Sequence, residues 1–255
     1  MTGARETVKG AVGANPGTEA GDRRGNAVAE PRVTRMFDSI APVYDRMNTL
    51  MTLGLDGRWR RAAVRAAALR PGGTAVDVAC GTGKLTAALA DAVGPEGHVV
   101  GVDLSPAMLN QARLAFEELE GVEFQIGNAL ALPVAGGSFD AATIAFGLRN
   151  LSSFEDGIRE MARVVRSGGK VVCLELSVPR PRSIGRVYTD AFRIMAPALG
   201  AAFRRRAAYS YLPHSLDGFP AAEEMAATMR RVGLNHVSFK RLALGAVALH
   251  VGTVA

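Results

Sequence analysis

Short apolar runs alternate with helix-forming segments along most of the chain. Five of these runs are typical of buried strands, at residues 75–79, 98–102, 122–126, 138–146 and 170–176. Two further runs, 236–243 and 245–254, follow each other almost directly. This order predicts an α/β fold, a doubly wound, Rossmann-like and mostly parallel seven-stranded sheet that ends in an antiparallel pair. Such a sheet binds its ligand at the carboxyl ends of the strands.

Helical patterns lie between these strands. A helix-forming run covers 84–92, and Ser105 followed by Pro106 is typical of a helix start. Further patterns cover 154–165, which Ser167, Gly168 and Gly169 should stop, and 221–231.

The N-terminal part has a different pattern. Residues 1–30 are rich in glycine, alanine and charge without a period, which predicts a disordered tail before a domain spanning 31–255. A helical pattern begins at Val33, and Pro42 should break it. The helical unit 31–70 has two interpretations, a plain packing unit or a lid over the site. Apolar Leu50, Met51, Leu53 and Trp59 favour core packing, whereas polar Tyr44, Asn48 and Asp56 favour the lid.

The first strand runs directly into the sequence VDVACGTG, a turn that a helix follows at once. Gly81 and Gly83 permit unusual backbone angles and close approach of a ligand. Asp103 lies twenty positions after Gly83, at the end of the second strand, where a nucleoside-binding fold places its ribose-binding carboxylate. Thr86 occupies the position of the third glycine of a dinucleotide motif. The turn, with Asp77 before it, therefore predicts a nucleoside ligand without a pyrophosphate, S-adenosylmethionine, rather than NAD or a structural turn.

The third strand ends in Gly127, Asn128 and Ala129, where an adenine is usually held. The Asn128 side-chain oxygen can accept a hydrogen bond from the exocyclic amine, and the Ala129 amide can donate to a ring nitrogen. Asn128 is also compatible with a plain turn residue.

Composition narrows the picture further. The 255 residues contain 48% hydrophobic residues but no apolar run of about twenty, and the start lacks a secretory signal, so we expect a cytoplasmic protein. Cys80 and Cys173 lie in apolar runs and are expected to be buried free thiols, and the four histidines show no ligand spacing, so no metal site is expected.

The net charge of +6 is local. Residues 180–206 contain seven arginines and one acid, so the rest of the chain sums to zero and nucleic acid is not an expected partner. We interpret 180–220 as a basic helical insertion near the substrate site. Along the helical pattern of 184–195 and just before it, Arg182, Arg186 and Arg193 gather opposite an apolar face. Such a helix either packs on its own domain or makes peripheral contact with an anionic membrane, at its inner face for a cytoplasmic protein.

Several segments outside the glycine turn resemble one family. They are YDRMNTLMTLGLDGRW, TIAFGLRN, RVVRSGGKVVCLELS, YSYLPHSLDGFP and GAVALH, in order from about Val33 to the C-terminus. Together with a turn resembling the first motif of class I methyltransferases, they are similar to the C-methyltransferases of ubiquinone and menaquinone biosynthesis. The resemblance implies cofactor contacts at Thr82, Asp103, Asn128 and Ala129. The chain departs from the family pattern at several positions. Ala145 replaces a common serine, Asp56 a common histidine and Ala79 a common glycine. Pro213 and His214 also differ from the usual residues.

The resemblance implies transfer of a methyl group from S-adenosylmethionine to demethylmenaquinol, a polyprenyl quinol. Alternatives are a polyprenyl benzoquinol of ubiquinone biosynthesis, a natural-product phenol, and a noncatalytic cofactor-binding protein. The oligomeric state stays open, a homodimer included.

A ring carbon becomes nucleophilic when its phenol oxygen carries negative charge, which requires a cationic donor. Arg149 is the candidate, with Asn150 orienting the ring oxygen or a water and Tyr44 closing the site. The structural alternatives are a surface salt bridge of Arg149 with Glu155 or Asp156, and simple packing of Tyr44.

Overall fold

The computed structural model describes residues 30–179 and 215–255, and scattered positions between 185 and 211. Almost all of the tail predicted for residues 1–30 lies outside the described residues. The same holds for most of the basic insertion, including Arg182, Arg186, Pro213 and His214. The helix and the membrane contact predicted there therefore stay predictions.

Seven strands form one sheet in the order β3-β2-β1-β4-β5-β7-β6. The pairs from β3 to β5 are parallel, and β7 is antiparallel to β5 and β6. This confirms the predicted doubly wound, mostly parallel sheet. The strand order reverses between β1 and β4, which is where such sheets bind ligands. The strands are β1 (Thr74–Val78), β2 (His98–Asp103), β3 (Val122–Ile126), β4 (Phe139–Ala145), β5 (Val165–Leu176), β6 (Asn235–Leu242) and β7 (Val247–Thr253).

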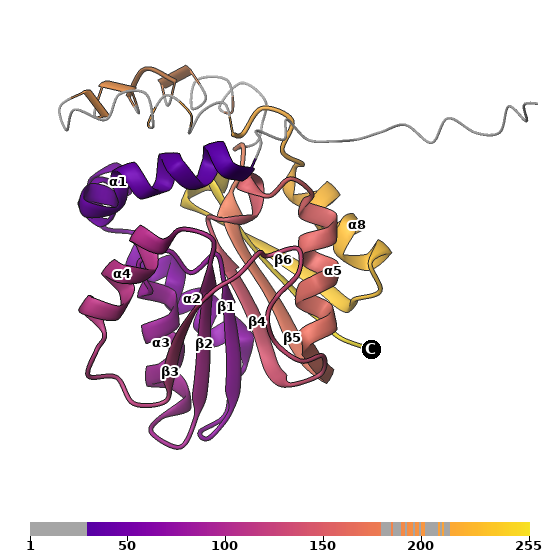
Figure 1. Ribbon diagram of the computed structural model, residues 1–255. Helices are drawn as coiled ribbons and strands as arrows, with labels where there is room; N and C mark the ends of the chain where they lie inside the picture. The colour runs from indigo at the N-terminus through magenta and orange to yellow at the C-terminus, as the bar shows by residue number, and fades with distance from the viewer. Residues whose placement is uncertain are drawn as a thin grey trace, which may run out of the picture.

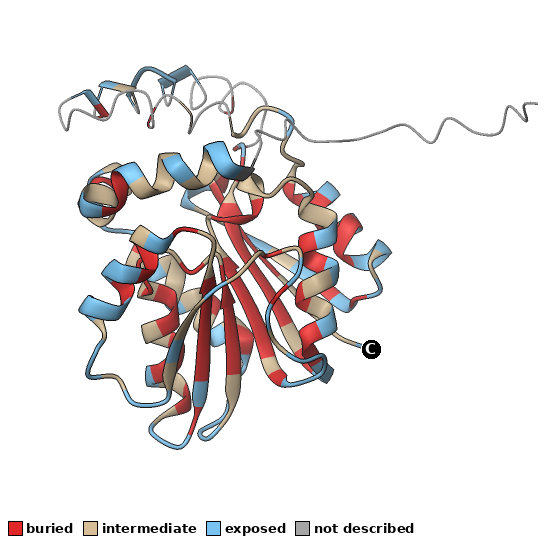
Figure 2. Ribbon diagram, viewed as in Figure 1, coloured by how far each residue is buried: buried red, intermediate tan, exposed pale blue. Residues whose placement is uncertain are grey.

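Helices cover both faces of the sheet (Figure 1). Because side chains alternate along a strand, Val76 and Val78 share a core with α5 and α8, whereas Ala75 shares one with α2 and α3. Figure 2 shows the central strands buried between these layers. The helices are α1 (Glu30–Met51), α2 (Asp56–Ala67), α3 (Lys84–Val93), α4 (Pro106–Ala115), α5 (Phe154–Val164) and α8 (Ala222–Arg231), with the short 3-10 helices η1 (Leu148–Asn150) and η2 (Ala243–Gly245).

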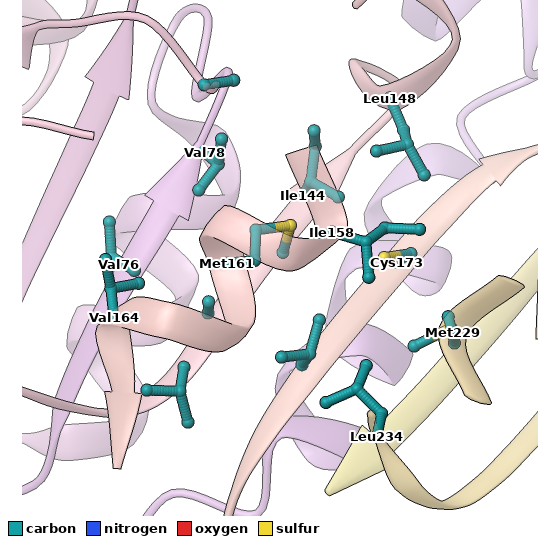
Figure 3. Close-up of a cluster of buried hydrophobic side chains, with 14 of the residues drawn as sticks. Val76, Val78, Ile144, Leu148, Ile158, Met161, Val164, Cys173, Met229 and Leu234 are labelled. Carbon is teal, nitrogen blue, oxygen red and sulfur yellow. The ribbon is translucent and has the colours of Figure 1, made fainter. Parts of the chain in front are cut away.

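The core between the sheet and α5 fixes the position of the loop after β4. Ile158 and Met161 of α5 share a fully buried cluster with Ile144 of β4 and Leu148 of η1 (Figure 3). Each fully buried aliphatic side chain stabilises the fold by roughly 1.5–3 kcal/mol. The loop between β4 and α5, which carries Arg149 and Asn150, is therefore anchored at both ends.

The start of α4 follows the capping prediction. The Ser105 hydroxyl accepts a hydrogen bond from the Met108 amide at 3.2 Å, and Pro106 is the first residue of α4, as predicted. Ser153 caps α5 in the same way through the Asp156 amide. Cys80 and Cys173 are both buried and free.

Two predictions about element boundaries are wrong. Helix α1 continues through Pro42 instead of breaking there, because burial of Ile40, Ala41 and Met47 offsets the one missing amide. Strand β5 begins at Val165, directly after α5, so the glycines at 168 and 169 lie inside a strand. A register shift between the pairs of Phe139 and Ala141 with β5, and a φ of +79° at Gly168, accommodate them.

The apolar residues of the N-terminal unit divide between core and surface, with Met51 and Trp59 packed against buried clusters. Leu50 is 47% exposed and Leu53 is 85% exposed, so neither belongs to the core. Helix α1 lies across the carboxyl edge of the sheet (Figure 1) and packs on α4. Within the described part of the chain, no helix has the length and apolar character needed to cross a membrane.

Candidate active site

A first cavity opens at the carboxyl edge of the sheet, between the loops after β1, β2, β3 and β4. Helix α1 forms its remaining wall. The predicted site residues that line it are Tyr44, Gly81, Asp103, Asn128, Ala129 and Asn150. The structure therefore brings together residues that are spread over more than a hundred positions of the sequence. The other predicted site residues are not among the described residues that line this cavity. They are Asp77, Thr82, Gly83 and Arg149.

Asp103 ends β2 and holds two loops in place. Its Oδ2 atom accepts a hydrogen bond from the Gly81 amide at 2.8 Å, and Oδ1 accepts one from the Ser105 amide at 2.8 Å. Burial raises the pKa of the Asp103 carboxyl above its usual value, and the amide donors Ser105 and Gly81 oppose this shift. The carboxylate thus ties the glycine turn to the start of α4 while it faces the cavity.

The glycine turn adopts left-handed backbone angles. Gly81 has a φ of +57° and an added Cβ there would meet nothing within 4 Å, which leaves open space for a ligand. Gly83 has a φ of +79°, and an added Cβ would lie 2.9 Å from the Phe124 ring of β3, so this glycine allows the turn to pack closely on β3. The Thr82 hydroxyl donates to Asp45 Oδ1 at 2.8 Å and is buried away from the cavity.

Asp77 is buried in the middle of β1, on the face that packs on α3. The hydroxyls of Thr86 and Thr143 each donate to its carboxylate at 2.8 Å. Burial raises the pKa of Asp77 to about 6, against the effect of these two hydrogen bonds. The Thr86 hydroxyl, at the position where a dinucleotide motif has glycine, is therefore a partner of the buried acid.

Asn128, just after β3, forms the contact of a turn residue and also lines the first cavity. Its side-chain oxygen accepts from the Leu130 amide at 2.9 Å, which is the local contact of an Asx turn. The same residue and Ala129 line the first cavity. Asn128 is therefore a turn residue that also faces the candidate ligand site.

The loops after β1 and β4 approach each other closely at the cavity. Ala79 and Phe146 have φ values of +50° and +60°, which are unfavourable for residues other than glycine. An added Cβ at Gly147 would lie 2.6 Å from the Ala79 Cβ, so only glycine fits there. Strained backbone of this kind is concentrated at functional sites. The family's glycine at the position of Ala79 has a physical reason in this backbone angle.

A second cavity of about 340 Å³ lies next to the first. Its walls come from α1, α2, η2 and the loop after β4, and most of its lining is apolar, including Met51, Leu53 and Trp59. Phe37, Tyr44 and Phe146 line both cavities. These three aromatic residues mark the junction at which a molecule in one cavity meets a molecule in the other.

Tyr44 is surrounded by polar groups at this junction. Burial raises the pKa of its hydroxyl, while the guanidinium groups of Arg60 and Arg149 and a hydrogen bond with Asn48 oppose the shift. The phenol therefore stays protonated at neutral pH and can donate a hydrogen bond.

Arg149 lies in the second cavity, not on the surface. Its Nη1 atom donates to Glu175 Oε1 at 2.6 Å, and the two side chains are only 4% and 3% exposed. It also donates to the Phe146 carbonyl and to the Ser215 hydroxyl. The expected structural alternative, a surface pair with Glu155 or Asp156, is wrong, since Glu175 is its carboxylate partner. Asn150 donates weakly to the Phe146 carbonyl, at 3.4 Å, and lines the first cavity.

Two acidic residues on α1, which the sequence analysis did not single out, hold this helix over the site. Asp38 accepts from the Ser105 hydroxyl at 2.5 Å, and Asp45 accepts from Thr82 and lies 3.4 Å from Lys84 Nζ. Asp38 and Asp45 are seven residues apart, two turns of a helix, so they share one face. That spacing was the available signal, but their partners lie in loops far away in sequence.

The strand order and the position of the first cavity indicate the class of protein. Both are typical of the S-adenosylmethionine-dependent methyltransferase fold. A solved SAM-dependent methyltransferase of Thermotoga maritima has a TM-score of 0.62 to this chain, with 20% sequence identity over 87% of this chain and 99% of that one. At this identity the similarity shows the fold alone.

Comparison with sequence relatives also shows the family. The chain matches the ubiE/COQ5 methyltransferase family over residues 26–254. A demethylmenaquinone methyltransferase of Desulfitobacterium hafniense is 42% identical over 223 residues, 85% of this chain and 87% of the relative. One from Bacillus cereus is 39% identical over 226 residues, 88% and 95% of the two chains. The protein belongs to the ubiE/COQ5 methyltransferase family, and S-adenosylmethionine is its cofactor.

Proposed function

We propose that the protein transfers the methyl group of S-adenosylmethionine to a ring carbon of demethylmenaquinol and so forms menaquinol. The observation that carries the proposal is the pair of adjoining cavities, one with the carboxylate and glycines suited to adenosine, the other apolar and lined by arginines. The names of the relatives support the choice of demethylmenaquinol. A polyprenyl benzoquinol is the second candidate acceptor.

The residues of the first cavity fit the cofactor. The Asp103 carboxylate would accept hydrogen bonds from the ribose hydroxyls, Gly81 would leave room for close approach, and Asn128 and Ala129 would hold the adenine. Asp77, Thr82 and Gly83 act indirectly, since they support the turn from its buried side. When bound, the cofactor supplies a methyl group already activated on a positively charged sulfur.

The second cavity holds the quinol ring against the junction formed by Tyr44 and Phe146. A carbon–carbon bond forms as the carbon–sulfur bond breaks, and one proton is released overall. Arg149 stabilises charge on the ring oxygen, Asn150 orients that oxygen or a water, and Tyr44 donates a hydrogen bond and excludes water. The buried Glu175 holds the Arg149 guanidinium in a fixed position.

Access requires movement of α1, since this helix covers both cavities. Its contacts through Asp38 and Asp45 are with the two loops that follow β1 and β2, so loop and helix positions are linked. We interpret α1 as the lid on this basis.

The proposed contact with a membrane rests on the sequence. The arginines of 182–206, the apolar positions between them, and a polyprenyl tail that partitions into lipid support peripheral contact with an anionic membrane surface. The charge pattern favours electrostatic attraction that salt should screen.

Side-by-side methyl transfer to demethylmenaquinol and to a polyprenyl benzoquinol tests the proposal. We expect faster transfer to demethylmenaquinol under equal conditions. Faster transfer to the benzoquinol would assign the ubiquinone pathway instead. Binding of S-adenosylmethionine without transfer to either acceptor, or to a panel of soluble phenols, would make the protein a noncatalytic binder.

A further inference from the structure

Arg149 shares its charge with a buried carboxylate, which weakens its effect on a substrate. Its guanidinium forms a hydrogen-bonded pair with Glu175 inside the protein, at 2.6 Å. A carboxylate at contact distance cancels most of the field of a cation at points beyond the pair. Full stabilisation of a negative ring oxygen in the second cavity therefore calls for a second cation in addition to Arg149.

Arg60 of α2 lines the same cavity and is poorly paired. Its side chain is only 12% exposed, and the nearest carboxylate oxygen, Asp56 Oδ2, lies 3.9 Å from Nε, beyond hydrogen-bond distance. Within the described part of the chain, the buried Nε atom has no hydrogen-bond partner. Buried donors are almost always paired, so a buried, unpaired guanidinium N–H beside a cavity indicates an acceptor supplied by a ligand.

The guanidinium group lies close to the junction between the two cavities. Its Cζ atom is 5.5 Å from the centroid of the Phe146 ring, which lines both of them. Its charge also acts on Tyr44, another side chain of the junction. Arg60 is thus held by an aromatic face on one side and faces the place where an acceptor ring must meet the methyl group.

The other charged and titratable groups around this position make Arg60 the outstanding candidate. The described lining of the second cavity contains Tyr44 from α1, Asp56 from α2, Arg149 from η1 and Tyr209. Asp56 is the sole carboxylate among them, and it lies one helical turn from Arg60. Asp77 of β1 also experiences the charge of Arg60, but it lies beneath the cavity.

We propose that Arg60 donates a hydrogen bond to the acceptor's phenolic oxygen and holds it as the anion, with Asp56 and Phe146 keeping the guanidinium in place. This inference rests on the proposed function, in which the acceptor is a quinol. The hydroxyl proton leaves to solvent before transfer, and the ring proton replaces it on oxygen when aromaticity is restored. Arg60 itself stays protonated throughout. Arg149 acts on the same oxygen more weakly, and its ion pair with Glu175 forms part of the cavity wall.

Ionisation of bound 1-naphthol tests this role without turnover. Its phenolate absorbs differently from the phenol, so the pKa of the bound hydroxyl can be read directly. A cation in contact lowers such a pKa by about 1–3 units, so we expect it to be that much lower in the parent than in Arg60→Met or Arg60→Gln. Arg61→Met is the matched control, an exposed arginine on the same helix, and should behave as the parent.

Single-turnover transfer to demethylmenaquinol gives a second readout. In the Arg60→Met variant, the pH at half-maximal rate should move upward by about 1–3 units, because the acceptor ionises later. Equal bound pKa values and equal pH profiles in parent and variants would overturn the assignment while the proposed function stands. A parent that lowers the naphthol pKa through Arg60 yet fails to methylate demethylmenaquinol would overturn the proposed function alone. If Arg60→Met does not fold, the same comparison is made with Arg60→Gln and Arg60→Lys, and Arg60→Lys should keep part of the pKa shift.

Discussion

Replacement of Arg149 by methionine should destabilise the protein strongly, before any effect on catalysis. The change leaves the Glu175 carboxylate, only 3% exposed, without its cation. Two backbone donors remain, the amides of Arg149 and Leu176 at 3.2 and 2.8 Å, but neither carries charge. Removing one partner of a buried ion pair costs about 3–5 kcal/mol, so we expect a loss of that size in the free energy of unfolding.

A double-mutant cycle separates this cost from the role in methyl transfer. Glu175→Gln removes the charge and keeps one side-chain oxygen as an acceptor for the backbone amides, so Arg149→Met/Glu175→Gln should recover at least about 2 kcal/mol relative to the single variant. Urea unfolding with a constant slope measures each free energy. Arg159→Met, which breaks exposed pairs with Glu155 and Asp156, is the control and should cost less than about 1 kcal/mol.

The stabilised double variant then reports on chemistry. If Arg149 also stabilises charge on the ring oxygen, single-turnover transfer should fall by about a hundredfold to a thousandfold while cofactor affinity is retained. Parental turnover in the double variant would limit Arg149 to a structural role. An Arg149→Met variant as stable as the parent would refute the reasoning from the buried pair.

Three further results are expected. Asp103→Ala should weaken S-adenosylmethionine binding by about 1.5–3 kcal/mol, the contribution of hydrogen bonds to a charged group, and calorimetry that finds unchanged affinity would remove Asp103 from the site. Burial raises the pKa of Asp77 from 3.8 to about 6, so the folded state binds more protons than the unfolded chain between those values, and stability should fall by about 2 kcal/mol as pH rises from 4 to 6. Asp77→Asn should lack this loss in urea unfolding at the two pH values, and an identical pH dependence would place the titration elsewhere. The parent should sediment with anionic vesicles at low salt and be released at high salt. A charge-reversed variant at Arg182, Arg186 and Arg193 should stay in solution. Equal sedimentation of both proteins would argue against membrane contact.

The features that could be predicted from the sequence are those with a local signal. Alternating apolar runs define the sheet, a serine followed by proline defines the start of α4, and the spacing from Gly83 to Asp103 defines the cofactor loop. Each depends on residues within one or two elements, so its physical cause lies in the local pattern.

The features that could not be predicted depend on distant partners. Val165 begins β5 because it pairs with Phe139 of β4, although the glycines after it read as a helix stop. Glu175, the partner of Arg149, lies twenty-six positions away and reads as part of an apolar strand. No pattern along the chain indicates which of the arginines on α2 faces inward.

The central claim, methylation of a quinol on carbon, can be tested with demethylmenaquinol deuterated at its open ring position. Transfer to carbon replaces the deuterium, so the product should gain one methyl group and lose the label, with loss of label equal to methyl incorporation. A methylated product that keeps all of its deuterium would show transfer to oxygen and contradict the proposed function.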